Sequence, residues 1–192
     1  SILFNNDNKL ISLFPKINIH EMLFLLEKNF KGFIIKSGIP FSLFWDKSIG
    51  AFGSWEIHTQ SNIGEGGTFK NLNIKDSFNK FTKNNLNIYN ILNKNYIYHL
   101  KLDDIEFKTI QILFAFEIKN EKEKDIIKCI DLSSKSFIID HLGNKNLIIP
   151  NFLEYNECIE LINRYGYLIN SPQEQGLQLI SANGNTCKII NK

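Results

Sequence analysis

The strand predicted over 105–119 constrains the fold more than any other part of the chain. From Ile110 on, its residues alternate with a period of two, which is typical of a β-strand that has one face in the core. Short β-prone segments bounded by turn residues follow it, which places this strand in an antiparallel meander. One face is expected to carry Ile110, Ile112, Phe114, Phe116 and Ile118, and the other Gln111, Leu113, Ala115, Glu117 and Lys119.

The rest of the chain supplies helices and further short strands. Asn18 and Glu21 form a capping-box pattern for a helix over 19–30, and an amphipathic helix is predicted over 153–165. The stretch 74–93 is irregularly helical. Further strands are predicted at 33–36, 41–45, 52–60, 96–102, 126–132, 136–140 and 147–149, with a hairpin over 176–190.

This order of elements has no regular βαβ alternation, which disfavours a parallel sheet. The predicted class is therefore α+β: a long antiparallel β-meander, as a curved sheet or partial barrel, flanked by two or three helices. A chain of 192 residues with 43% hydrophobic residues normally forms one core. No linker or shift in composition divides it, so a single domain over 1–192 is predicted.

Composition also bears on the source and the location. Valine is absent and Arg164 is the only arginine, which indicates codon bias in an A+T-rich genome. Cys129, Cys158 and Cys187 form no CxxC pair and are expected to be thiols in a reducing compartment. With no leader pattern and no apolar run long enough to span a membrane, we expect an intracellular, cytoplasmic protein or one from an organelle with such a genome.

Charge is uneven along the chain although the net charge is only +2. Residues 71–102 contain aromatic residues interleaved with lysines, the combination that binds single-stranded nucleic acid. The alternative is that the aromatic residues are core and the lysines a solvated face. The lysines concerned are Lys75, Lys80, Lys83, Lys94 and Lys101.

Two neighbouring features are candidates for a binding site. In the strand predicted over 52–60, Ser54, Glu56, His58 and Gln60 share one face, where a carboxylate and an imidazole lie close enough to pair. The loop after it contains Gly64 and Gly66, but its spacing fits neither a Walker motif nor a kinase glycine-rich loop. We expect the strand face and the loop to form the rim of a pocket.

The end of the strand 110–119 carries the one catalytic pattern. Glu117-Ile118-Lys119, preceded by Asp103-Asp104, resembles the signature of the PD-(D/E)xK nucleases. The resemblance covers fewer than twenty residues and lacks the proline before the aspartate. It implies that Asp104 and Glu117 bind Mg²⁺ and that Lys119 orients the attacking water. The alternation gives both Glu117 and Lys119 an ordinary place on the polar strand face.

The first hypothesis is therefore a non-enzymatic ligand-binding or protein-interaction module with a sheet-lined pocket, without cofactor or metal. The partner is an unknown small molecule or protein. The alternative is a Mg²⁺-dependent nuclease acting on DNA or RNA, with the lysines of 71–102 contacting phosphates. A nucleic-acid binder without hydrolysis is the third.

Overall fold

The structure is a computed structural model, and it describes residues 2–4, 9–13, 30–59, 67–69, 71–85, 87–103, 105–120, 125–141, 143–165, 174–181 and 186–190. The chain divides into two compact units, which are described separately. The larger consists of residues 1–15 and 38–149, and the smaller of residues 16–37 and 150–192. The single domain over 1–192 stays a prediction.

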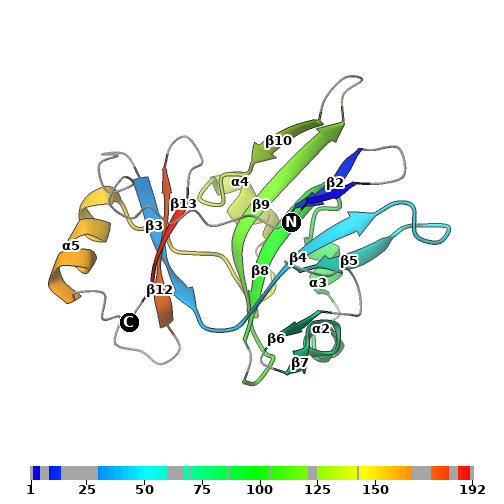
Figure 1. Cartoon of the computed structure of the whole chain (residues 1–192), viewed down its shortest axis with the longest axis horizontal. Coiled ribbons are helices and arrows are strands. Elements are labelled where there is room, and N and C mark those ends of the chain that lie inside the picture. Colours follow the sequence, from blue (N-terminus) through cyan, green and yellow to red (C-terminus); the bar gives the residue numbers. More distant parts are fainter. Residues whose placement is uncertain are drawn as a thin grey trace. The chain divides into compact units, whose positions relative to one another are not determined.

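The larger unit is built on an open antiparallel sheet with the strand order β10-β9-β8-β4-β5 (Figure 1). This confirms the α+β class and the antiparallel sheet. The short β11 (Leu147–Ile148) joins β9 in parallel, so the sheet is not purely antiparallel. The other strands are β4 (Ile39–Asp46), β5 (Ser54–His58), β8 (Tyr96–Leu102), β9 (Ile110–Asn120) and β10 (Asp125–Cys129).

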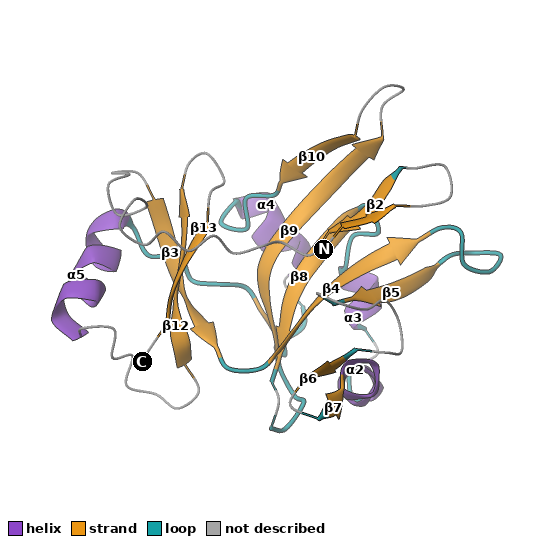
Figure 2. Cartoon of the chain, in the orientation of Figure 1, coloured by secondary structure: helices purple, strands orange, loops and turns teal. Residues whose placement is uncertain are grey.

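Three helices of this unit pack on one face of the sheet (Figure 2). They are α2 (Ile74–Lys83), α3 (Ile88–Ile91) and α4 (Lys135–His141). Phe41 of β4 meets Phe78 of α2 with ring centroids 5.3 Å apart. Trp55 of β5 stacks on Tyr89 of α3 at 6.4 Å. Such aromatic contacts bury large apolar areas, so this face holds the core of the unit.

A β-bulge changes the alternation expected for β9. Between two consecutive pairs with β8, this strand carries one extra residue, Leu113. A bulge of this kind shifts the side-chain alternation by one residue. Ile110 and Ile112 thus share a face with Glu117, and not with Phe114 as the sequence pattern predicted.

Two short hairpins complete the larger unit. The strands β1 (Ile2–Phe4) and β2 (Leu10–Leu13) pair with each other, as do β6 (Thr68–Phe69) and β7 (Leu72–Asn73). Asn73 then caps α2, because its side-chain oxygen accepts a hydrogen bond from the Asp76 N–H at 3.0 Å. The sequence pattern predicted neither hairpin.

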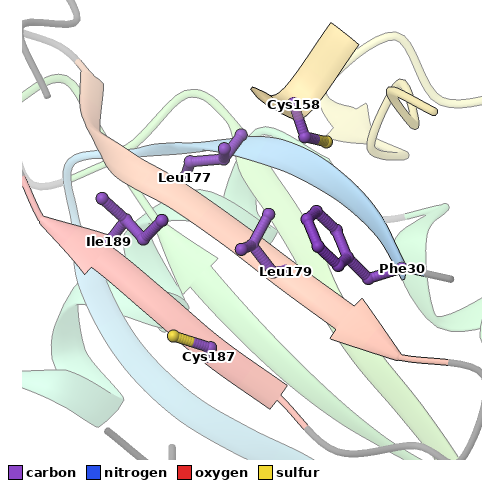
Figure 3. Packing of buried hydrophobic residues seen from close by; sticks show 6 residues of the cluster. All are labelled: Phe30, Cys158, Leu177, Leu179, Cys187 and Ile189. Carbon is purple, nitrogen blue, oxygen red and sulfur yellow. The ribbon is translucent and has the colours of Figure 1, made fainter. Parts of the chain in front are cut away.

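The smaller unit is a three-stranded antiparallel sheet covered by one helix. Its strands, β3 (Phe30–Lys36), β12 (Glu174–Ser181) and β13 (Thr186–Ile190), have the order β13-β12-β3, and its helix is α5 (Tyr155–Tyr165). The helix and hairpin predicted for this part of the chain are confirmed. Buried side chains from all four elements form its core, among them Phe30, Cys158, Leu177, Leu179, Cys187 and Ile189 (Figure 3).

Three local predictions have different outcomes. The strand predicted at 136–140 is wrong, because these residues belong to α4, where the Ser134 hydroxyl accepts a hydrogen bond from the Phe137 N–H at 3.3 Å. The segment 105–109 forms a turn rather than the start of β9. The helix predicted over 19–30 lies outside the described residues except for Phe30, which begins β3.

Candidate binding groove

The central sheet is paired at one end and open at the other. The register between β4 and β8 runs from Ile39 with Leu102 to Leu43 with Tyr98. Beyond Leu43, within the described residues, β4 pairs only with β5, and β8 pairs only with β9. The strand β2 contacts both β4 and β9 at this opening (Figure 1). A groove of about 520 Å³ lies there.

Four chain segments line the groove. They are β2, the end of β4 with the turn after it, the turn before β8 with the start of that strand, and the end of β9. Its chemistry is mixed: besides Phe44 and four aliphatic residues, it has two aromatic side chains with a polar atom, three lysines, two carboxylates and two amides. These are Trp45, Tyr96, Lys47, Lys94, Lys119, Asp46, Glu117, Asn95 and Asn120.

Side-chain hydrogen bonds hold β2 at the end of the β9–β10 hairpin. The Leu10 N–H donates to Asp125 Oδ2 at 2.8 Å, and Asn120 Nδ2 donates to the Leu10 carbonyl oxygen at 3.2 Å. Asn120 also donates to Asp125 Oδ1 at 2.7 Å. The hydrogen bonds from Asn120 and from the Leu10 N–H stabilise the charged carboxylate and so lower the pKa of Asp125, and the bond from Asn120 has the larger effect. The groove thus has one wall that is tied in place.

Trp45 is one of the apolar residues that line the groove, and its ring has two described contacts. The Trp45 ring meets the Trp55 ring of β5 edge-on, with the ring centroids 5.5 Å apart. Lys94 Nζ lies over the Trp45 ring, 3.7 Å from its centroid. This is a cation–π contact, which contributes about 0.5–1 kcal/mol where the cation is exposed. Lys94 is exposed, and its side chain is long and flexible. A flat ligand can therefore replace the ammonium on the ring at small cost.

Glu117 and Lys119 lie on one face of β9 at the rim of the groove, as the alternation predicts. The Lys119 Nζ is 3.7 Å from Glu117 Oε2, and the lysine side chain is 59% exposed. An ion pair in water is weak, so the lysine remains available to an anion. Sequence reasoning thus found two lining residues of the groove, although for a different chemistry.

The strand face predicted as a binding surface lies partly under β2. His58 is buried, and its Nδ1 is 3.0 Å from the hydroxyl oxygen of Ser12. Burial lowers the pKa of His58. Ser54 and Glu56, on the same edge strand, are half-buried and are not among the residues that line the groove. The other predicted rim residues, Gln60, Gly64 and Gly66, lie outside the described residues.

The geometry of β8 and β9 does not favour the nuclease hypothesis. Asp104 lies outside the described residues, but its neighbours Asp103 and Ile105 belong to the turn between the two strands. Asp103 Oδ1 accepts the Ile105 N–H at 3.0 Å, an ordinary role for an acid in a turn. Glu117 pairs with Tyr96 at the other end of the hairpin, about 20 Å away at ~3.4 Å per residue.

One Mg²⁺ ion holds its ligands at about 2.1 Å. Glu117 and the turn after β8 are therefore too far apart to share a metal ion. Within the described ranges, no group of three or more His, Cys, Asp or Glu residues is placed to hold one. The nuclease hypothesis stays an untested alternative that this geometry weakens.

The lysines of residues 71–102 do not form one surface. Lys101 is buried in β8. Lys80 lies over the Phe107 ring at 5.2 Å, and Lys83 is exposed at the end of α2. Lys75 is half-buried at the start of the same helix, whereas Lys94 lies in the groove. A continuous phosphate track is therefore not supported.

A second polar cluster is buried beneath α4. The Tyr98 hydroxyl accepts a hydrogen bond from the Asn93 N–H at 2.8 Å and lies 2.9 Å from His141 Nε2. His141 Nδ1 is 2.8 Å from the Phe137 carbonyl oxygen, which can only accept. The proton of the neutral ring is therefore on Nδ1, and Nε2 accepts from the tyrosine. Each partner is satisfied, which makes this a structural cluster.

Sequence reasoning did not group Trp45, Lys94 and Tyr96 as one site, although Lys94 was among the lysines expected to contact nucleic acid. Each is an aromatic or basic residue near the end of a predicted strand, a position shared by many core and surface residues. Only the cross-strand pairs show that these ends are adjacent and open.

Comparison with known proteins gives no relative: no protein-family model, curated protein or solved structure matches this chain. In the part of the chain that the structure describes, no helix is both long and apolar enough to cross a membrane. The function must therefore be argued from the groove itself.

Proposed function

We propose that this chain is a non-enzymatic ligand-binding module and that the groove between β4 and β8 holds the ligand. The observation that carries the proposal is the opening of the sheet beyond Leu43, where a ring face and three lysines converge on one space. A volume of about 520 Å³ is within the usual range for small-molecule sites, about 300–1,000 Å³.

The lining favours a small anion with a flat apolar part. The Trp45 ring offers a stacking surface once Lys94 moves aside. Lys47, Lys94 and Lys119 then supply charged donors to a carboxylate or phosphate. Of the two carboxylates, Asp46 already accepts two bonds from Ser48, and Glu117 is paired with Lys119. They therefore oppose an anion less than free carboxylates would.

An extended peptide is the second candidate, in keeping with a protein-interaction module. The end of β4 and the start of β8 each have a described strand partner on one side only. Unpaired strand edges accept an added strand through main-chain hydrogen bonds, while side-chain pockets give specificity.

Fluorescence of tryptophan tests the proposal, because the chain contains only Trp45 and Trp55 and they contact each other. A panel of aromatic carboxylates and aromatic phosphates is titrated into the protein. At least one is expected to quench the fluorescence saturably. Lys94→Glu should raise the Kd of that compound about fivefold or more, which corresponds to a loss of about 1 kcal/mol in binding free energy.

Lys83→Glu is the matched control, because it makes the same charge change at an exposed position on α2. If no compound binds, or if both variants bind alike, the small anion is excluded. A peptide that binds at the groove instead would shift backbone amide resonances along β4 and β8.

The intracellular location belongs to this proposal. Cys129, Cys158 and Cys187 form no disulfide, which is the state expected in a reducing compartment.

A further inference from the structure

The turn between β4 and β5 presents an apolar tip to solvent. Phe52 is 92% exposed, the highest value among the large apolar residues that the structure describes, and Ile49 in the same turn is 41% exposed. In Figure 1 this turn extends beyond the paired ends of β4 and β5. It continues directly from Asp46, Lys47 and Ser48, which line the groove.

This tip has a defined conformation, held at its base. Asp46 Oδ1 accepts hydrogen bonds from the Ser48 N–H at 2.8 Å and the Ser48 hydroxyl at 2.7 Å. Gly53 has φ +81°, and a Cβ there would lie 2.7 Å from Trp45 Nε1, so only glycine allows the turn to lie against this ring. This structured turn therefore keeps the apolar side chain of Phe52 in water, where its exposure is unfavourable. Transfer of the ring to an apolar environment would stabilise it.

We propose that this tip inserts into the surface of an anionic membrane. The proposal goes beyond the function of the groove and does not require a bound ligand. Phe52 and Ile49 enter the boundary between headgroups and acyl chains, where apolar side chains leave water. The neighbouring lysines, Lys47 first, attract anionic headgroups.

Size argues for a membrane rather than a protein partner or a second copy of the chain. A stable protein interface takes about 800 Å² from each partner and needs matching shapes. Two protruding side chains do not supply that area, whereas a bilayer accepts them without a matching surface. Two side chains at the tip of a turn reach only the boundary between headgroups and acyl chains, so the proposed contact is peripheral.

Charge supports the same occupant. Lys47 is exposed and is the one charged residue of the turn 47–53, whereas Lys94 and Lys119 line the groove from which the turn continues and have Asp46 and Glu117 among them. Glu56 on β5 is the further acid on this hairpin. The base of the tip carries Trp45 and Trp55, paired in register, and tryptophan is favoured at the level of lipid headgroups.

Co-sedimentation with vesicles tests the proposal. Vesicles of phosphatidylcholine with phosphatidylserine should bind the protein, and binding should weaken as salt rises. Phe52→Ser should lower the partition coefficient about tenfold or more, the loss expected for one buried phenyl ring. Ile105→Ser is the matched control, because Ile105 is 72% exposed in the β8–β9 turn at the other end of the sheet. It should leave binding unchanged.

Two further measurements locate the contact. Brominated lipids should quench the tryptophan fluorescence, because both tryptophans lie at the base of the tip. Lys47→Gln should weaken binding about fivefold to anionic vesicles, the effect of about one lysine, and leave binding to pure phosphatidylcholine unchanged.

Absence of vesicle binding would overturn the proposal, as would equal binding by Phe52→Ser and the unchanged protein. Self-association in sedimentation velocity that Phe52→Ser abolishes, without vesicle binding, would assign the tip to a second copy instead. These outcomes do not depend on the groove ligand, so the two proposals fail separately.

Discussion

The two ends of the central sheet differ in what their residues do. At the end where β4, β8 and β9 pair continuously, Phe41, Leu43, Tyr98 and Ile112 are fully buried. At the other end the same strands separate, and polar or charged side chains surround a groove. One sheet thus contains a packed end and an open end.

This difference teaches where to look for stability and where to look for binding. Truncating a side chain in a close-packed interior lowers the free energy of unfolding, because the cavity that is left does not fill. Half-exposed polar residues cost little when changed. Substitutions at the packed end should therefore lower stability, and substitutions at the open end should alter binding with the fold intact.

The largest effect is expected from Phe41→Ala. The Phe41 ring is 0% exposed and packs against Phe78, so its removal should lower the free energy of unfolding by about 3–5 kcal/mol. Denaturant titration measures this. Phe52→Ala at the open end removes a ring that contacts water and should cost about 0.5 kcal/mol or less. Equal losses would break the comparison.

Gly38→Ala should come next, at about 2–4 kcal/mol. Gly38 has φ +146°, and an added Cβ would lie 2.2 Å from the Leu102 carbonyl oxygen, which the sheet holds in place. Gly50→Ala is the control at the open end: φ is +64° and nothing lies within 4 Å of the added atom. That variant should lose about 1 kcal/mol. Thermal or denaturant unfolding distinguishes them.

Tyr98→Phe should cost about 1–3 kcal/mol. The change removes the hydroxyl that joins the Asn93 N–H to His141 and leaves the buried His141 Nε2 and the part-buried Asn93 N–H without this partner. Tyr96→Phe, at the half-exposed start of the same strand, should cost about 0.5 kcal/mol or less. A loss for Tyr96→Phe as large as for Tyr98→Phe would show that the open end is equally constrained.

Acid should destabilise the packed end through its histidines. Burial lowers the pKa of His99 from 6.5 to about 3, and it also lowers the pKa of His58 and His141. Below about pH 6.5 the unfolded chain therefore binds more protons than the folded one. The free energy of unfolding should fall as the pH drops from there, and His99 should contribute up to about 1.4 kcal/mol per pH unit down to about pH 3.

His99→Phe is the variant that checks this pH dependence. The ring of His99 already stacks on Phe114, so a phenyl ring is a close replacement. The slope of stability between about pH 7 and pH 5 should become shallower. An unchanged slope would show that His99 does not contribute.

The smallest effect is expected from Lys119→Ala. Its ion pair with Glu117 spans 3.7 Å in water, so unfolding should become easier by about 0.5 kcal/mol or less. Binding of an anionic ligand should weaken measurably, which isothermal titration can detect. A large loss of stability would place Lys119 among the structural residues.

The candidate site was only partly predictable. The alternation of β9 located Glu117 and Lys119 on the same strand face, which agrees with the structure, although the bulge puts Ile110 and Ile112 on that face too. The bulge at Leu113 was not predictable, because Leu113 is an ordinary strand residue and the extra position exists only relative to β8. His58 was predicted at the rim of a pocket but is buried, because β2 from a distant part of the chain covers it.

The sequence by itself determined the α+β class, the antiparallel pairing of β8 with β9, the helix α5 and the final hairpin. These depend on periodicity and turn residues within a few positions of one another, which local chemistry controls. The tertiary structure alone decided that β4 pairs with β8, and that this pairing stops at Leu43. Residues more than fifty positions apart meet there, so the opening that forms the groove depends on global packing, which no local pattern records.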